Sequence, residues 1–180
     1  IGSEGTLGII TKAGLRVAPL PKARRLVIAS FEDAEAAGRA VAKTFASGIV
    51  PSACEILDRT TVKVLRRCDP NLVLPEGDVI LFEVDGTEGS TKESAEEIVR
   101  VCSPTAALVV VASGEKEMEE IWEARRLVGA AVSRIDPTKS RIYVGEDVGV
   151  PIKEIPALIQ MVSEISERFR LPAMKYGHIG

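Results

Sequence analysis

The chain has 180 residues, which is long enough for one domain with its own hydrophobic core. Its net charge is −3 with the two signs interspersed, which gives no support for nucleic-acid binding, since that function needs a basic face. No apolar run approaches the ~18 residues of a membrane-spanning helix, and no signal-peptide pattern opens the sequence.

A glycine-rich segment opens the chain, with glycines at positions 2, 5 and 8 and with Ser3 and Thr6 between them. Glycine lets the backbone approach a ligand closely and adopt a positive φ angle. Exposed N–H groups on such a backbone can hold a phosphate or the edge of a planar cofactor. The spacing differs from the G-x-G-x-x-G of a dinucleotide-binding turn, and no strand precedes it. A nicotinamide fold is therefore not indicated, and a tight turn before a strand is the alternative.

The rest of the chain alternates between strand-like and helix-like patterns. Residues 6–17 are predicted as a strand or hairpin arm, and Pro19 and Pro21 then mark a domain boundary near residue 20. The periodicity predicts strands at 26–29, 51–57, 79–84, 106–112, 141–150 and 173–178, and helices at 32–47, 59–67, 90–102, 115–133 and 155–169.

Local signals refine three of these elements. Asp58 is predicted to cap the helix that follows it, and Ser90-Thr-Lys-Glu93 has the pattern of a capping box. Residues 106–112 are almost all apolar, so we expect this strand to be central in its sheet.

The alternation of strands and helices could mean a parallel, doubly wound sheet. The strands are short, however, and no phosphate loop follows the first core strand, which favours a split β-α-β arrangement. We therefore expect an α+β fold with a ferredoxin-like antiparallel sheet.

Arg125 interrupts the apolar stripe of the helix predicted at 115–133. At about 100° per residue it falls near the middle of that stripe, between Trp122 and Val128. A charge on the core side of a helix is rarely unpaired, because its desolvation costs several kcal/mol. Arg125 therefore extends to solvent, pairs with a buried acid, or lines a pocket that binds an anion.

The chain contains a single histidine, His178, and three widely spaced cysteines at positions 54, 68 and 102. A lone histidine is structural or solvated more often than catalytic. An odd number of cysteines without C-x-x-C spacing argues against a disulfide framework and against a zinc or iron–sulfur site. We expect three small buried side chains in a reducing compartment, hence a cytoplasmic location, with peripheral attachment to a membrane left open.

The segment Gly2-Ser-Glu-Gly-Thr-Leu-Gly-Ile-Ile-Thr11 resembles the end of the FAD-binding domain in the FAD-linked oxidases of the vanillyl-alcohol oxidase superfamily, in particular its glycolate oxidase and D-lactate dehydrogenase members. The resemblance covers nearly the whole chain. It implies that residues 1–20 end an FAD-binding domain and that residues 21–180 form a substrate-binding cap, truncated at its C-terminus, with helices packed on one side of its sheet. It implies FAD contacts from Gly2, Ser3, Gly5, Thr6, Gly8 and Ile9.

Two further motifs resemble the cap of this family. Trp122-Glu-Ala-Arg125 is similar to a W-x-x-R motif whose arginine binds the substrate carboxylate. Tyr176-Gly-His178 is similar to the start of G-H-x-G-D-G-N-x-H, in which the first histidine ligates a divalent metal. The resemblance implies catalytic roles for His178 and Arg125 and a substrate contact from Tyr176. Only one candidate metal ligand is present, so a Zn or Mn site is expected only in a longer form of the enzyme.

Other matches to the family carry less information about the site. Residues 146–151 resemble a D-x-x-x-P strand end, but Gly145 stands where some relatives have a substrate-binding lysine, which leaves the preferred side chain of the substrate open. Residues 52–58 and 82–86 are read as fold markers, with Glu83 facing the site as an alternative.

The function implied by the resemblance is FAD-dependent oxidation of a 2-hydroxy acid, of the glycolate or D-lactate type, to the 2-oxo acid. Electrons would pass to an iron–sulfur subunit, a quinone or a flavoprotein carrier. We expect no tight FAD binding and no turnover from the 180 residues alone.

Two alternatives remain open at this point. One is a stand-alone ferredoxin-like binding or interaction module without redox activity, in which the segment 1–11 is solvated and dispensable. The other is a sister enzyme that acts on alkyl-glycerone phosphate, which would need more basic residues around Arg125.

Overall fold

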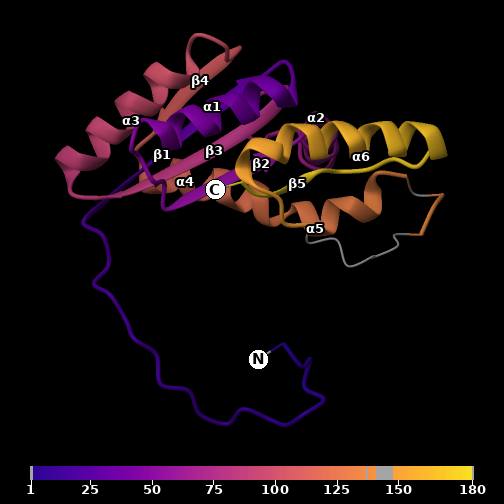
Figure 1. Ribbon diagram of the computed structural model, residues 1–180, viewed down its shortest axis with the longest axis horizontal. Coiled ribbons are helices and arrows are strands. Elements are labelled where there is room, and N and C mark those ends of the chain that lie inside the picture. Colours follow the sequence, from indigo (N-terminus) through magenta and orange to yellow (C-terminus); the bar gives the residue numbers. More distant parts are fainter. Residues whose placement is uncertain (1, 137, 141–147, 180) are drawn as a thin grey trace.

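The computed structural model describes residues 2–136, 138–140 and 148–179. Its centre is a five-stranded sheet in the order β4-β1-β3-β2-β5, in which all four pairings are antiparallel (Figure 1). The strands are β1 (Ala23–Phe31), β2 (Ala53–Leu57), β3 (Asp78–Gly86), β4 (Leu108–Ala112) and β5 (Tyr176–His178).

The connections between the strands give a ferredoxin-like topology. Helix α1 (Ala34–Ala46) links β1 to β2, which lies on the far side of β3, and α3 (Glu88–Cys102) links β3 to β4 on the far side of β1. This is the split β-α-β arrangement. Strand β5 then adds to the sheet beside β2. The predicted α+β fold with an antiparallel sheet is therefore confirmed.

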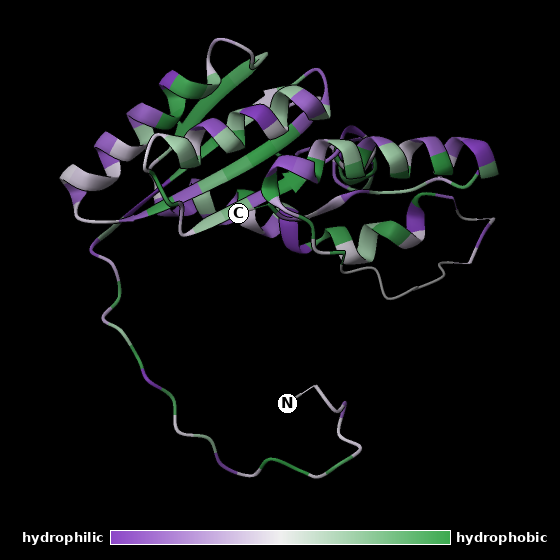
Figure 2. Cartoon of the chain, in the orientation of Figure 1, coloured by the Kyte–Doolittle hydropathy of each residue, from purple (hydrophilic) through white to green (hydrophobic). Residues whose placement is uncertain are grey.

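Helices cover both faces of the sheet, whereas the resemblance implied helices on one side. The core on one face contains residues of α1, α3 and α6 (Ile155–Phe169), and the core on the other face contains residues of α2 (Arg59–Cys68), α4 (Glu115–Arg126) and α5 (Val128–Ala131). The reason lies in the two central strands. Leu26–Ala29 and Val79–Phe82 are apolar at consecutive positions and fully or almost fully buried, so neither face can remain open to water (Figure 2).

Aspartate side chains cap two helices, and the cap at Asp58 is the predicted one. The Asp33 side chain accepts the N–H of Ala36 at 2.7 Å at the start of α1, and the Asp58 side chain accepts the N–H of Thr61 at 2.9 Å at the start of α2. Each cap satisfies a backbone N–H that the first helical turn leaves without a partner.

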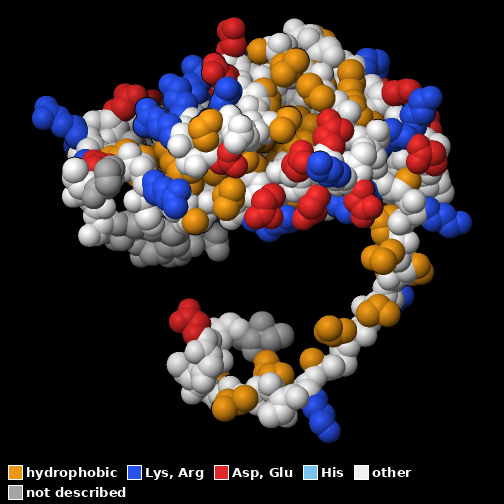
Figure 3. Space-filling model, turned by 180° about the vertical axis from the view of Figure 1, so that it is seen from behind, with side chains coloured by type: hydrophobic (Ala, Val, Ile, Leu, Met, Phe, Trp, Pro, Cys, Tyr) orange, Lys and Arg blue, Asp and Glu red, His pale blue; other side chains and the backbone are white. Residues whose placement is uncertain are grey.

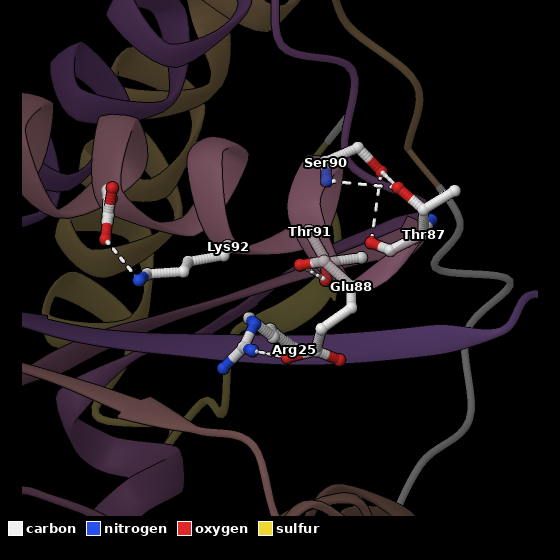
Figure 4. A network of polar contacts seen from close by, with 7 residues as sticks. Arg25, Thr87, Glu88, Ser90, Thr91 and Lys92 are labelled. Carbon is white, nitrogen blue, oxygen red and sulfur yellow. Dashed lines mark hydrogen bonds and ion pairs between the residues drawn. The ribbon is translucent and has the colours of Figure 1, made fainter.

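The capping box of α3 lies three residues earlier than predicted. Thr87, not Ser90, is the N-cap, and Ser90 completes the box from the N3 position (Figure 4). Gly86 ends β3 with φ +147°, which brings the chain into the turn before the helix. Arg25 of β1 reaches Glu88 in the first turn and ties the helix start to the sheet (Figure 4).

Strand β4 lies at the edge of the sheet, so its predicted central position was wrong. Leu108, Val110 and Val111 remain 48%, 40% and 39% exposed. The apolar run in β4 resembles that of a buried strand, but the crossover through α3 delivers it to the outer side of β1. An apolar sequence does not distinguish these two positions.

Other predicted elements differ in extent. The helix predicted at 115–133 is divided into α4, α5 and a short 3-10 helix, η1 (Val132–Arg134); a second, η2 (Ile152–Glu154), precedes α6. The strand predicted at 141–150 falls largely outside the described residues. None of the described helices is long and apolar enough to cross a membrane.

Residues 2–22 form an extended segment that leaves the domain before β1 (Figure 1). The strand predicted at 6–17 is absent, because no neighbouring strand pairs with this segment among the described residues. Its apolar side chains face solvent, and Leu7 and Ile9 are 88% and 90% exposed (Figure 3).

The three cysteines differ in accessibility, which predicts their reactivity. Burial raises the pKa of the Cys102 thiol to about 12 and raises the pKa of the Cys54 thiol as well, whereas Cys68 is half-buried. Since the thiolate is the nucleophile, we expect one fast thiol at about pH 8, that of Cys68. Titration with Ellman's reagent should count one fast thiol in the native protein and three in denaturant. Cys68→Ser should remove the fast phase and Cys102→Ser should leave it, and two fast thiols in the native protein would contradict the burial.

The packing of α1 against α6 depends on Gly38. A Cβ at this position would overlap the ring of Pro156, which cannot turn away as a flexible side chain could. We expect Gly38→Ala to lower the free energy of unfolding by about 1–3 kcal/mol, measured by urea denaturation. Gly89→Ala in α3 is the matched control, because a Cβ there meets no atom within 4 Å. It should leave the stability unchanged or raise it by up to about 1 kcal/mol. Equal losses in the two variants would contradict a tight contact at Gly38.

Candidate functional site

Two carboxylates lie side by side in the interior of the domain, on the sheet face that α4 covers. Glu55 of β2 and Glu83 of β3 are only 4% and 9% exposed. Glu83 pairs with Ala53 across the two strands, so Glu55 is its diagonal neighbour on the same face. Because two buried carboxylates without partners would cost several kcal/mol each, their surroundings must supply cations or N–H donors.

Glu83 is held by β1 and α4 together. Arg24 donates from Nε to Oε1 at 2.9 Å and from Nη2 to Oε2 at 2.7 Å, and the indole Nε1 of Trp122 donates to Oε2 at 2.7 Å. The hydrogen bond to Glu83 raises the pKa of the Arg24 guanidinium. A forked pair of this kind fixes geometry as well as charge. Glu83 therefore joins three elements of the fold.

Glu55 is held by α4 and β5. Arg125 donates from Nε to Oε2 of Glu55 at 2.9 Å, and Nδ1 of His178 lies against Oε1 of the same carboxylate. The guanidinium of Arg125 also stacks over the ring of Tyr176, with Cζ 5.1 Å from the ring centroid. The Arg125 side chain is 20% exposed and that of His178 is 87% exposed, so the pair reaches the surface.

The spacing of two residues along α4 directs both hydrogen-bond donors of this helix toward the carboxylates. Trp122 and Arg125 are three residues apart, so they lie on one face of the helix. The buried residues Met118, Ile121 and Ala124 anchor that face on the sheet. Of the three possibilities for Arg125, pairing with a buried acid is the one found in the structure.

Strand β5 places Tyr176 and His178 beside β2, the strand that carries Glu55. His178 pairs with Glu55 and Tyr176 pairs with Leu57 across β2 and β5. Alternate residues of a strand face the same side, so both side chains lie on the Glu55 face.

This arrangement can bind an anion and accept a proton. With Nε of Arg125 directed to Glu55, the two terminal amino groups form the edge that can receive a planar anion such as a carboxylate. With Nδ1 of His178 held by a carboxylate, Nε2 is the nitrogen available to an outside group.

Three of the residues predicted from the sequence thus come together: Arg125, Tyr176 and His178. The six residues predicted to contact a cofactor, all between Gly2 and Ile9, do not join them, because they lie in the exposed segment before the domain. This segment does contain a tight turn. Gly2 and Gly5 have φ angles of +75° and +78°, and the N–H of Thr6 donates to the carbonyl of Ser3 at 2.9 Å.

Sequence reasoning missed the centre of the site. Glu55 was read as a fold marker, Glu83 as a site residue only in the alternative, and Arg24 not at all. The available signal was a glutamate inside an apolar strand, in Ala-Cys-Glu55-Ile-Leu and in Leu-Phe-Glu83-Val. Such a residue is rarely buried without a partner.

The residues present do not fit a metal site. Within the part of the chain that the structure describes, no group of three or more His, Cys, Asp and Glu side chains lies close enough to hold an ion. Among the described residues, the donors at His178 are its own imidazole and one carboxylate, which Arg125 already occupies. In the segment 146–151, which resembles a D-x-x-x-P strand end, Glu146 and Asp147 lie outside the described residues.

The comparisons with known proteins give one consistent result. The family model for FAD linked oxidases, C-terminal domain, matches residues 20–180. The glycolate oxidase subunit GlcD of Bacillus subtilis is 32% identical over 183 residues, covering 100% of this chain and 38% of that protein. The glycolate oxidase subunit GlcD of Escherichia coli K12 is 28% identical, covering 99% of this chain and 36% of that protein. A mitochondrial D-lactate dehydrogenase [cytochrome] of Arabidopsis thaliana is 27% identical, covering 100% and 31%. The chain therefore spans less than two fifths of the length of these relatives.

Solved structures show the same fold. Two crystal forms of alkyldihydroxyacetonephosphate synthase match with TM-scores of 0.50 and 0.53 at 20% identity. The first match covers 68% of this chain and 26% of the synthase chain, and the second covers 74% and 27%.

The hydrogen bond from Trp122 to Glu83 can be tested by removing only the donor. Trp122→Phe keeps an aromatic ring but lacks the indole N–H, and we expect it to lower the free energy of unfolding by about 1–2 kcal/mol. The measurement is urea unfolding followed by circular dichroism, because Trp122 is the only tryptophan and cannot serve as the probe. A double-mutant cycle with Glu83→Met, which removes both acceptor oxygens, isolates the pair, and a coupling energy below about 0.3 kcal/mol would contradict the bond.

Proposed function

The chain belongs to the FAD-linked oxidases as a C-terminal domain of that family, and on this premise we propose that it forms the substrate-binding cap of an FAD-dependent 2-hydroxy acid oxidoreductase. The substrate class that we propose is a 2-hydroxy acid of the glycolate or D-lactate type, and the product is the 2-oxo acid. The single observation that carries the proposal is a cluster at the surface of the domain, in which Arg125 and His178 both pair with Glu55 and Tyr176 stacks on Arg125.

Arg125 and Tyr176 bind the substrate in this proposal. The two terminal amino groups of Arg125 receive the carboxylate as a bidentate pair, while Nε stays on Glu55. The ring of Tyr176 supports the guanidinium from one side and limits its movement. A substrate held by its carboxylate presents its 2-hydroxyl group at a fixed distance from the neighbouring His178.

His178 accepts the proton of the hydroxyl group as the bond to oxygen becomes a carbonyl. Its exposed imidazole has Nδ1 directed at Glu55, which leaves Nε2 for this proton. When bound, FAD would supply the acceptor for the hydride that leaves the carbon bearing this hydroxyl group. The proton and the hydride together account for the two hydrogens lost in the oxidation.

The glycine segment supports a role in contacting the edge of a flavin cofactor. Gly2 and Gly5 have positive φ angles, and the space around Gly2, Gly5 and Gly8 is open, with no atom within 4 Å of a Cβ built there. We propose that Gly2, Ser3, Gly5, Thr6, Gly8 and Ile9 contact FAD. One short segment supplies few contacts, so we also propose that the 180 residues alone bind FAD weakly and do not turn over.

Partners of the assembled enzyme are part of the same proposal. The matched relatives of B. subtilis and E. coli are each a subunit of glycolate oxidase by their names. This supports an electron-transfer partner, for which we propose an iron–sulfur subunit.

A charge count supports a carboxylic acid over a phosphate. Among the described residues of the site, Arg24 and Arg125 are balanced by Glu83 and Glu55, which leaves no excess of positive charge for a phosphate dianion. The stand-alone binding module is favoured by one observation, the exposure of the segment before β1. Deleting residues 2–11 from the protein expressed with its flanking sequence separates the two candidates. A flavoenzyme loses its flavin, and a stand-alone module is unaffected.

The proposed role of Arg125 predicts a selective loss of substrate affinity. We expect Arg125→Gln to raise the KM for glycolate or D-lactate and to lower kcat/KM about tenfold to a hundredfold, because a charge-assisted pair is lost. The protein is expressed with whatever sequence its gene encodes on either side of these residues. Activity is measured as anaerobic flavin reduction and as reduction of an artificial electron acceptor.

Arg126→Gln is the matched control for that experiment. It removes the same charge from the next residue of α4, which pairs with the exposed Glu119 and Glu123. It should leave KM unchanged. Equal effects of the two variants would contradict the role of Arg125, and a wild-type protein that reduces no flavin with any 2-hydroxy acid would contradict the proposed function.

A further inference from the structure

We infer that Glu55 is a positioning residue that sets two parts of the site at once: one carboxylate oxygen orients the guanidinium of Arg125, and the other fixes the proton position on His178. The inference rests on the proposed function, because that function gives the two side chains their roles. Glu55 itself touches neither the substrate nor the cofactor in this scheme.

The backbone around Glu55 leaves its carboxylate little freedom. It lies in β2 with β3 on one side and β5 on the other, paired with Leu81 and with His178. Its side chain is 5% exposed, so it cannot turn into solvent to exchange its partners. A side chain locked in this way is suited to hold other groups in place.

The two oxygens of this carboxylate have different partners. Oε2 accepts from Nε of Arg125 at 2.9 Å, and Oε1 lies against Nδ1 of His178. A carboxylate that is paired with an arginine acts as a hydrogen-bond acceptor only. Nδ1 must therefore carry a hydrogen, and in the neutral ring Nε2 keeps the lone pair that can accept a proton from outside.

The neighbouring Glu83 shows that this arrangement is not a general property of the sheet. Three N–H groups, from Arg24 and Trp122, converge on Glu83, and neither side chain belongs to the proposed reaction. Glu83 thus ties α4 to β1, whereas Glu55 ties α4 to β5. Glu83 therefore has a structural role, and Glu55 has a positioning role.

Glu55→Gln separates the two oxygens chemically. The amide has one acceptor oxygen and one donor nitrogen, and Arg125 can only donate, so the amide oxygen turns to Arg125. The amide nitrogen then faces Nδ1 of His178, which must accept, and the proton moves to Nε2. The variant therefore reverses the tautomer of His178 without deleting the side chain.

Nitrogen NMR of the 180-residue chain reads this tautomer directly. His178 is the only histidine, so its two ring-nitrogen signals need no assignment among others. In the wild type we expect the neutral ring to carry its hydrogen mainly on Nδ1, and in Glu55→Gln mainly on Nε2. Asp78→Asn is the control, because Asp78 is a buried carboxylate of the same sheet that lies outside the site. It should leave the tautomer as in the wild type.

Kinetics of the enzyme expressed with its flanking sequence give the second readout. We expect Glu55→Gln to raise KM and also to lower kcat, with kcat/KM reduced about tenfold to a hundredfold. Glu55→Asp keeps the acceptor character at a shorter reach and should recover the Nδ1–H tautomer and part of kcat. If Glu55→Gln fails to fold, the comparison of Glu55→Asp with the wild type still tests the inference.

The two readouts separate this inference from the proposed function. If the wild type oxidises no 2-hydroxy acid, the proposed function fails while the tautomer still decides whether Glu55 fixes His178. If the wild type is active and Glu55→Gln leaves the tautomer unchanged, the positioning role is overturned and the function stands. If Glu55→Gln reverses the tautomer of His178 but leaves kcat unchanged, the role of Glu55 in the reaction is overturned.

Discussion

The structure depends on the neutralisation of two carboxylates inside an antiparallel sheet. Glu55 and Glu83 occupy positions where apolar residues would otherwise face α4, and an unpaired charge there would cost several kcal/mol. Each carboxylate draws one side chain from α4, which fixes the helix in both rotation and height on the sheet. The same pairs leave Arg125 and His178 at the surface. The stability requirement of the core and the geometry of the site are therefore one arrangement.

The sheet itself explains why this arrangement needs helices on both faces. Consecutive apolar residues in β1 and β3 demand cover on each side, and α1, α3 and α6 provide it on the face without the site. The opposite face receives α2, α4 and α5, whose apolar contacts surround the buried polar pairs. Exclusion of water by these contacts strengthens the electrostatic interactions between the paired groups.

Local features were predictable from the sequence and long-range ones were not. The caps at Asp33 and Asp58 follow from residues three positions away, so the sequence contains all the information that they need. The partner of Arg125 is 70 residues distant in the chain, and no periodicity names it. The family resemblance pointed to Arg125 and His178 but gave no reason for their proximity, which is Glu55. The edge position of β4 was mispredicted for a related reason, because strand order is a property of the connections rather than of the strand.

The order of the strands also has a consequence for folding of the chain during its synthesis on the ribosome. Strand β1 is the first of the described strands to be synthesised, but its two neighbours in the sheet are β3 and β4. Its apolar faces therefore remain unpaired until α1, β2 and α2 have been synthesised and β3 has followed them. Strand β5 is the last of the described strands to emerge, and it carries His178 to Glu55. Until then a nascent domain can contain the sheet and the Arg125–Glu55 pair while lacking its imidazole. Among the described strands, the pairing of β5 with β2 and the arrival of the imidazole at Glu55 therefore belong to the same late step of synthesis.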